Sequence, residues 1–246
     1  MKASWFGHQY EEYPFELFSL SHLVMLFLLI AGVLMFYCFR YPLRRRSAFF
    51  RYTFFLLFIL LEFFYHYWMI KGGYWDTASM LPLQLCSLSL LLCIILLVTM
   101  SERLFQIVYF IGITGACMAI FTPELFLGFP HFRYFHFFVT HILIIWTCLY
   151  FVFVHGYKPT QKGMLLSFGF LNGSALVAFL VNVWTGGNYM FLSYKPVNGS
   201  LLDYLGPYPY YIFALEGMAI FLFYILLVPF KGKKEMKEGR RRDKPS

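Results

Sequence analysis

Charged residues are scarce in this chain of 246 residues, where Asp, Glu, Lys and Arg together make up 13% while apolar residues make up 60%. Soluble domains have about 25% charged and about 45–50% apolar residues. A soluble fold of this size could not cover its surface with so few ions, so the composition excludes that class. The mean hydropathy of +0.65 predicts an all-α membrane protein instead.

Cysteine is also rare, and none stands where a disulfide framework would need it. The five cysteines all fall inside apolar stretches, at Cys38, Cys86, Cys93, Cys117 and Cys148. Buried cysteine behaves as a small hydrophobic residue, so we predict no disulfides. The metal-binding spacings HExxH and HxH are absent as well. We therefore expect no metal and no other cofactor.

Seven apolar stretches are long enough to cross a bilayer, which takes about 20 residues each. They cover residues 18–39, 50–70, 81–100, 104–121, 135–154, 164–184 and 210–230. What remains makes short loops and two tails, which leaves no room for a soluble domain. We expect one bundle of about seven transmembrane helices over residues 1–230. A basic cytoplasmic tail, which we expect to be disordered, follows over residues 231–246.

Lysine and arginine are divided unevenly between the two sides of this bundle. Sixteen of the 20 fall on the side of the C-terminus, and four fall on the other, at Lys2, Lys71, Arg133 and Lys195. Basic loops stay in the cytoplasm. We therefore predict an N-terminus outside and a C-terminus inside a cell membrane. This also explains the net charge of +8 without a nucleic acid partner.

Polar side chains within the spans lie toward the predicted outer side. Ionisable groups at membrane depth are energetically expensive and usually face the interior of a bundle. Their shared depth predicts one polar cavity that opens outward and is capped by the long loop before the last span. The residues concerned are His22, Glu62, His66, Gln84, Cys86, Arg133, His136, His141, Asn182 and Glu216 in the spans, and Asn188, Tyr189, Lys195 and Asp203 in the loop.

A cysteine near a histidine is the arrangement of a nucleophile with its general base. We expect Cys86 to be the nucleophile and His141 the base, with Glu62 or Glu216 as a carboxylate that orients the histidine. Substrate-binding roles are expected for His22, His66, Gln84, His136, Asn182, Asn188, Tyr189 and Lys195. Transport of a small molecule, or ligand binding without catalysis, would use similar groups and stays open.

Six ordered segments carry a family resemblance that covers almost the whole chain except its tail. FSLSHL, LPLQLC, FTPELFLGFP, FHFFVTH, GGNYMFLSYKP and LLDYLGPYPYY resemble the YwaF-type family of bacterial integral membrane proteins. That family is distantly similar to a eukaryotic transmembrane acyltransferase that remodels ether phospholipids through a cysteine and a later histidine. It is more remotely similar to the threonine–histidine lipid hydrolases of the androgen-induced type.

The resemblance implies a lipid-modifying enzyme of the bacterial plasma membrane, an acyltransferase or a lipid hydrolase, with membrane lipid as its partner. It aligns the histidine of the catalytic pair with His141 and the nucleophile with the LPLQLC segment. Leu83 stands at the matching position in that segment, and Cys86 follows three residues later.

Overall fold

The computed structural model describes residues 5–8, 12–196 and 201–242, and its regular elements are all helical. The α-helices are α1 (Leu20–Cys38), α2 (Arg40–Arg45), α3 (Ser47–Gly72), α4 (Leu85–Thr99), α5 (Glu102–Phe121), α6 (Phe132–Phe153), α7 (Gln161–Thr185) and α8 (Tyr210–Arg242). Two short 3₁₀ helices, η1 (Tyr189–Phe191) and η2 (Leu201–Leu205), lie between α7 and α8.

Six of these helices are long and apolar enough to cross a membrane: α1, α3, α5, α6, α7 and the first part of α8, Tyr210–Lys231. This confirms a multi-pass helical membrane protein. The seventh apolar helix, α4, has only 15 residues and is about 22 Å long, which is shorter than the roughly 30 Å of hydrocarbon in a bilayer.

The expected third span was wrong in its first turn, because the helix begins at Leu85 rather than at residue 81. Proline has no N–H to give to a helix, and the residue before it avoids the helical conformation. Pro82 therefore keeps the chain irregular up to Gln84.

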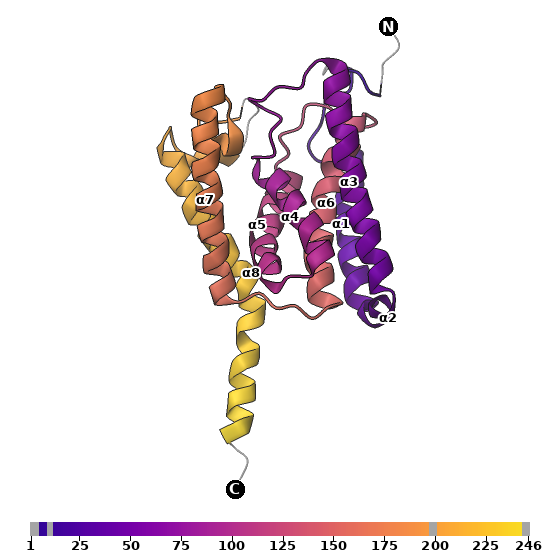
Figure 1. The fold of residues 1–246 in the computed structure, drawn as a ribbon, viewed down its shortest axis with the longest axis vertical. Helices are drawn as coiled ribbons and strands as arrows, with labels where there is room; N and C mark the ends of the chain where they lie inside the picture. Colours follow the sequence, from indigo (N-terminus) through magenta and orange to yellow (C-terminus); the bar gives the residue numbers. More distant parts are fainter. Residues whose placement is uncertain (1–4, 9–11, 197–200, 243–246) are drawn as a thin grey trace.

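The centre of the bundle is made by α5 and α6. In the most apolar stretch of each helix, the buried share is 50% for α5 and 72% for α6, against 11–28% for α1, α3, α7 and α8. Figure 1 shows α1 and α3 on one side of this centre and α7 with α8 on the other. The two central helices therefore position the side chains of the interior.

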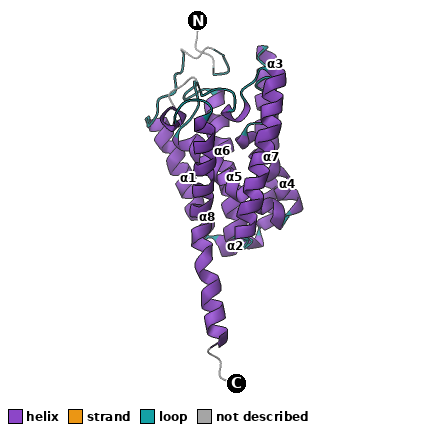
Figure 2. Cartoon of the chain, turned by 90° about the vertical axis from the view of Figure 1, so that its left-hand side faces the viewer, coloured by secondary structure: helices purple, strands orange, loops and turns teal. Residues whose placement is uncertain are grey.

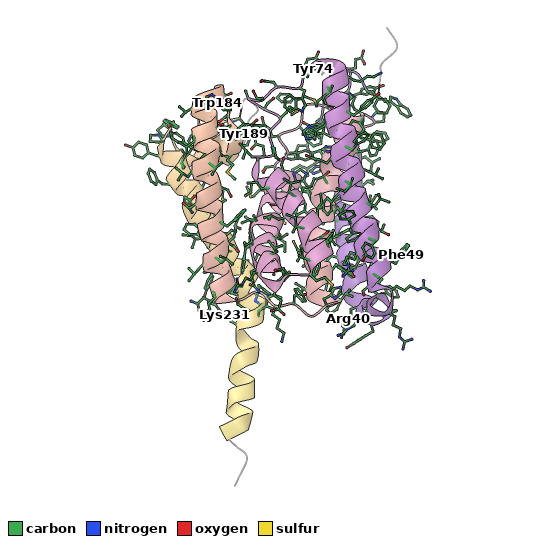
Figure 3. The ribbon with its side chains drawn as sticks, viewed as in Figure 1. Arg40, Phe49, Tyr74, Trp184, Tyr189 and Lys231 are labelled. Carbon is green, nitrogen blue, oxygen red and sulfur yellow. The ribbon has the colours of Figure 1, made fainter. Side chains whose placement is uncertain are left out.

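The helices α1, α3, α4, α5, α6, α7 and α8 alternate in direction along the chain, so their ends form two opposite faces of the bundle (Figure 1). We call them the upper and lower ends, as they stand in Figures 1 and 3. Tyr74, Trp184 and Tyr189 lie at the upper end, and Arg40 and Lys231 at the lower end. The predicted division of basic residues thus corresponds to the two ends, and which end faces the cytoplasm stays a prediction.

The last helix extends beyond the bundle. After its apolar part, α8 continues as helix to Arg242 and projects below the other helices (Figure 2). It thus covers most of the segment for which we expected disorder. Lysine, glutamate, methionine and arginine, which are abundant there, are good helix formers.

Candidate functional site

Two grooves lie at the upper end of the described chain, and Cys86 and His141 are not among the residues that line them. The larger, of about 650 Å³, lies beside α1 and the start of α6 and includes Ser19, Val24, Phe129 and Tyr134. The other, of about 460 Å³, lies beside Ile70, Gly73 and Trp75. The polar residues that we expected around one shared cavity are instead divided among separate contacts, because equal depth does not bring different helix faces together.

His22 makes a structural link between α1 and α5. Its Nδ1 accepts the backbone N–H of Phe18 at 3.1 Å, and its Nε2 donates to the carbonyl of Ile120 at 3.0 Å. The side chain is fully buried. Both ring nitrogens are occupied, so nothing remains to meet the substrate that we expected it to bind.

Glu62 and His66 form a pair on α3. His66 Nδ1 accepts from the indole N–H of Trp75 at 3.1 Å, so its Nε2 carries the proton and donates to Glu62 at 3.2 Å. The pair occupies both nitrogens of His66 and one carboxylate oxygen of Glu62. It lies on α3 and has no described contact with His141.

Tyr189, Asn182 and Gln84 fasten the irregular segment that precedes α4. The Tyr189 hydroxyl donates to the carbonyl of Thr77 at 2.6 Å and accepts the N–H of Leu81 at 2.9 Å. Asn182 bonds the backbone N–H and the carbonyl of Tyr189 at 2.7 and 3.0 Å. Gln84 accepts the N–H of Met190 at 2.9 Å. These contacts hold the start of α4 in place.

The remaining expected residues of the upper end make local contacts. Asn188 accepts two backbone N–H groups of its own loop, at 3.0 and 3.2 Å. Lys195 donates to the carbonyl of Asp203 at 3.5 Å. Glu216 on α8 accepts from Asn172 on α7 at 3.0 Å. None of these residues has a described contact with Cys86 or His141.

Four histidines are buried in the described part of the chain, and two of them have a ring nitrogen without a hydrogen-bond partner there. His22 and His131 have both ring nitrogens occupied. His136 accepts from Arg133 Nη1 at Nδ1, at 2.8 Å, and its Nε2 has no partner among the described residues. His141 donates from Nδ1 to the carbonyl of Phe137 at 2.6 Å. A carbonyl can only accept, so Nδ1 carries the proton of neutral His141 and Nε2 keeps a free lone pair.

Cys86 is the second residue of α4, at an end that has no side-chain cap. Within the described chain, the N–H groups of Leu85, Cys86 and Ser87 have no hydrogen-bond acceptor. Free N–H groups and the helix dipole favour negative charge at such an end. A Cβ placed on Gly115 of α5 would lie 3.7 Å from the Cys86 sulfur, so the absence of a side chain on Gly115 leaves room for the thiol.

The register of the central helices brings Cys86 and His141 to the same level. On α6, Cys148 Sγ lies 3.5 Å from the carbonyl oxygen of Val108 on α5, and one turn higher a methyl of Ile144 would lie 3.1 Å from a Cβ placed on Gly112 of α5.

Two helical turns nearer the upper end, the equivalents of Cys148 and Val108 are His141 and Gly115, and Gly115 adjoins Cys86 of α4. Seven residues return a helix to nearly the same face, and α4 and α6 run in the same direction. Cys86 and His141 therefore lie at about the same level of the bundle, near Gly115.

Thr140 is a residue that the sequence interpretation missed. It is 5% exposed, and its hydroxyl has no partner in the described part of the chain. Buried helical threonines commonly bond the carbonyl one turn earlier, as Thr147 does with Leu143 at 2.7 Å. Only its place beside His141 in the sequence could have drawn attention to it.

A family model covers nearly all of this arrangement. It is the TMEM164 family model, and it matches residues 17–227. The chain belongs to the TMEM164 family. The match includes α1 to α7 and most of the apolar part of α8, and it covers every expected site residue. It does not confirm the YwaF-type name.

No curated protein and no solved structure matches this TMEM164-family chain.

Proposed function

We propose that this TMEM164-family protein is a lipid-modifying enzyme that transfers or hydrolyses acyl groups, with Cys86 as the nucleophile and His141 as the general base. One relationship supports the proposal: His141 has a free Nε2 and stands at about the same level of the bundle as Cys86, on a helix that contacts α4. Cysteine–histidine pairs of this kind form acyl-enzymes. The resemblance to a phospholipid acyltransferase supports the same chemistry.

The proposed reaction begins when Nε2 of His141 takes the thiol proton of Cys86 and the sulfur attacks the carbonyl carbon of an acyl ester. The negative charge on the carbonyl oxygen would be met by the free N–H groups at the start of α4. The C–O ester bond then breaks, and His141 returns the proton to the departing alcohol oxygen, which leaves a thioester on Cys86. A second alcohol, or water, then attacks the thioester carbonyl and loses its proton to His141. The C–S bond breaks, and His141 returns the proton to the sulfur of Cys86.

The carbonyl of Phe137, rather than Glu62 or Glu216, orients His141 in this scheme. A hydrogen bond to Nδ1 fixes the tautomer that leaves Nε2 basic, which is the task of the third group in such sites. The hydrogen bonds of Gln84, Asn182 and Tyr189 hold the segment before α4, and with it Cys86, in place. Because these residues lie in the upper half, and because we infer that the upper end faces outward, the enzyme would draw its substrates from the outer leaflet.

The test uses the purified full-length protein in lipid vesicles with a phospholipid that carries an activated acyl ester. We expect one acyl group to appear on Cys86, as found by mass spectrometry of the peptide. Cys86→Ala should remove the label, and His141→Ala should slow its formation at least 100-fold. Cys117→Ala, which alters another half-buried thiol in the neighbouring α5, is the matched control and should label normally. Equal labelling of the wild type and Cys86→Ala would exclude the role of Cys86.

A second candidate function, small-molecule transport, is favoured by one observation. Asn172 and Glu216 place a polar pair between α7 and α8 within the apolar spans, and such pairs mark solute paths in transporters. Uptake of a solute into proteoliposomes that is lost in Glu216→Gln but unchanged in Cys86→Ala would support transport instead of acyl transfer.

A further inference from the structure

Arg133, the second residue of α6, carries a positive charge that no described carboxylate balances. Its Nη1 donates to His136 at 2.8 Å, and the ion pair found in the described chain joins other residues, His66 and Glu62. A guanidinium has five N–H donors, so most of those of Arg133 have no acceptor among the described residues. A charge at membrane depth is usually met by an opposite charge or by polar groups.

The guanidinium of Arg133 is held among aromatic rings. Long basic side chains near helix ends usually extend toward the headgroups and water. Arg133 instead lies 4.8 Å from the ring centre of Tyr65 on α3 and 5.6 Å from that of Phe137, one turn deeper on α6. Cation–π contacts of this kind fix the guanidinium plane, and its free N–H edge is thereby presented in one orientation.

His136 adds a second unsatisfied donor. Its Nδ1 accepts from Arg133, so the neutral ring carries its proton on Nε2. The ring is stacked on Tyr65 with centres 4.4 Å apart and is only 6% exposed, and Nε2 has no partner in the described chain. Buried donors are rarely left without an acceptor. Arg133 and His136 both lack acceptor oxygens, and a phosphate group supplies several.

We propose that Arg133 and His136 form a subsite for the phosphate group of a phospholipid, an inference that rests on the proposed acyl chemistry for its meaning. The ring of Phe137 has its centre 5.6 Å from the guanidinium of Arg133 and 4.4 Å from the imidazole centre of His141. The two groups are therefore at most about 10 Å apart. A phospholipid bound by its phosphate at Arg133 would extend its glycerol esters along α6 toward His141.

The position of the subsite favours the phosphate group of a lipid over a soluble phosphate. Arg133 lies in the first turn of a span, at the end of the bundle where Tyr74 and Trp184 are exposed. Exposed tyrosine and tryptophan mark the headgroup level of a membrane. A lipid phosphate is already concentrated at that level, whereas a soluble anion would have to leave water to reach it.

The experiment measures binding apart from chemistry by using Cys86→Ala as the background, since phosphate recognition does not need the thiol. Radiolabelled phosphatidylcholine and a diacylglycerol with the same two chains are bound to the purified protein in detergent. We expect tighter binding of the phospholipid by about tenfold or more, as charge-assisted hydrogen bonds imply. Adding Arg133→Gln should abolish that preference and leave diacylglycerol binding unchanged.

Two further variants keep the test decisive. Lys71→Gln removes a positive charge at the end of α3, near the same headgroup level, and should retain the preference. Arg133→Lys keeps the charge without the planar guanidinium and should retain part of the phospholipid preference. This variant can be measured if Arg133→Gln does not fold. An unchanged preference in folded Arg133→Gln would overturn the subsite. If soluble glycerol phosphate displaced the labelled phospholipid as well as unlabelled phospholipid does, the proposal that the subsite binds the phosphate of a lipid would be overturned.

Activity separates this inference from the proposed function. A phospholipid preference that depends on Arg133 in a protein that never labels Cys86 would leave the subsite standing and contradict acyl transfer. Labelling of Cys86 at equal rates by phospholipid and diacylglycerol probes, in both wild type and Arg133→Gln, would contradict the subsite and leave acyl transfer standing.

Discussion

Nδ1 of His141 lies 2.6 Å from the carbonyl oxygen of Phe137, one turn earlier on the same helix. The ring thereby gives its one neutral-state proton to its own backbone and keeps Nε2 as an acceptor. Because this orientation comes from α6 alone, it does not depend on a carboxylate from another helix. Two predictions about catalysis follow from it.

Replacement of His141 by Gln should remove the base while leaving the fold in place. Glutamine cannot accept a proton at neutral pH, so we expect acyl transfer to fall about 100-fold or more. Thermal unfolding of the purified variant should stay within a few degrees of wild type. Retention of more than a tenth of the wild-type labelling rate by His141→Gln would contradict the role of this residue as the base.

The two candidate carboxylates should matter much less than His141. Glu62 is bonded to His66, and Glu216 to Asn172, so neither reaches His141. We expect Glu62→Gln and Glu216→Gln to change the rate of acyl transfer less than tenfold, as measured with the same activated lipid. A loss as large as that of His141→Gln in either variant would show that the carboxylate orients the base after all.

Gly115 should be intolerant of a large side chain because of its position beside Cys86. A Cβ there would lie 3.2 Å from Leu85 and 3.7 Å from the Cys86 sulfur. Gly115→Leu should therefore displace the start of α4, with an overpacking penalty of about 1–3 kcal/mol, and reduce labelling of Cys86 at least tenfold. Gly169→Leu on α7, where nothing lies within 4 Å of a Cβ, is the control and should label normally.

Tyr189→Phe should loosen the segment before α4, because it removes the hydroxyl that contacts Thr77 and Leu81. A buried N–H left unpaired costs about 1–3 kcal/mol. We expect a lower unfolding temperature and faster hydrogen exchange over residues 77–84. Tyr194→Phe is the control, since that side chain is 55% exposed in the neighbouring loop. Equal exchange in both variants would mean that the hydroxyl of Tyr189 does not hold the segment.

The histidine that caps α6 should make stability depend on pH. Burial lowers the pKa of His131 from its ordinary value of 6.5. The unfolded chain therefore takes up this proton first as the pH falls. The stabilisation is fully present above about pH 6.5 and is lost as the pH drops toward the lower pKa of the folded state.

We expect the unfolding temperature to fall between pH 7 and pH 5, and to fall less in His131→Asn. Asparagine preserves a cap at this position but does not titrate. An identical pH dependence in the wild type and His131→Asn would show that His131 does not contribute.

Much of the architecture follows from the sequence alone. A soluble fold of this composition could not bury so many apolar stretches of about 20 residues, so they are predicted to span a membrane. Six long spans were predicted to within a few residues at most of their ends. The start of α4 was harder to predict from the sequence. The effect of Pro82 depends on whether another part of the chain supplies hydrogen bonds to the irregular segment. Tyr189, more than 100 residues later, does so.

The sequence by itself determined the depth of each polar side chain, because depth depends only on position along a span. Tertiary structure decided the partners, because these depend on the rotation and register of neighbouring helices. His22, His66 and His141 share the upper half of the bundle, yet packing occupies both nitrogens of the first two and leaves Nε2 of His141 free. The packing of α5 against α4 and α6 sets the register that brings Cys86 and His141 to the same level.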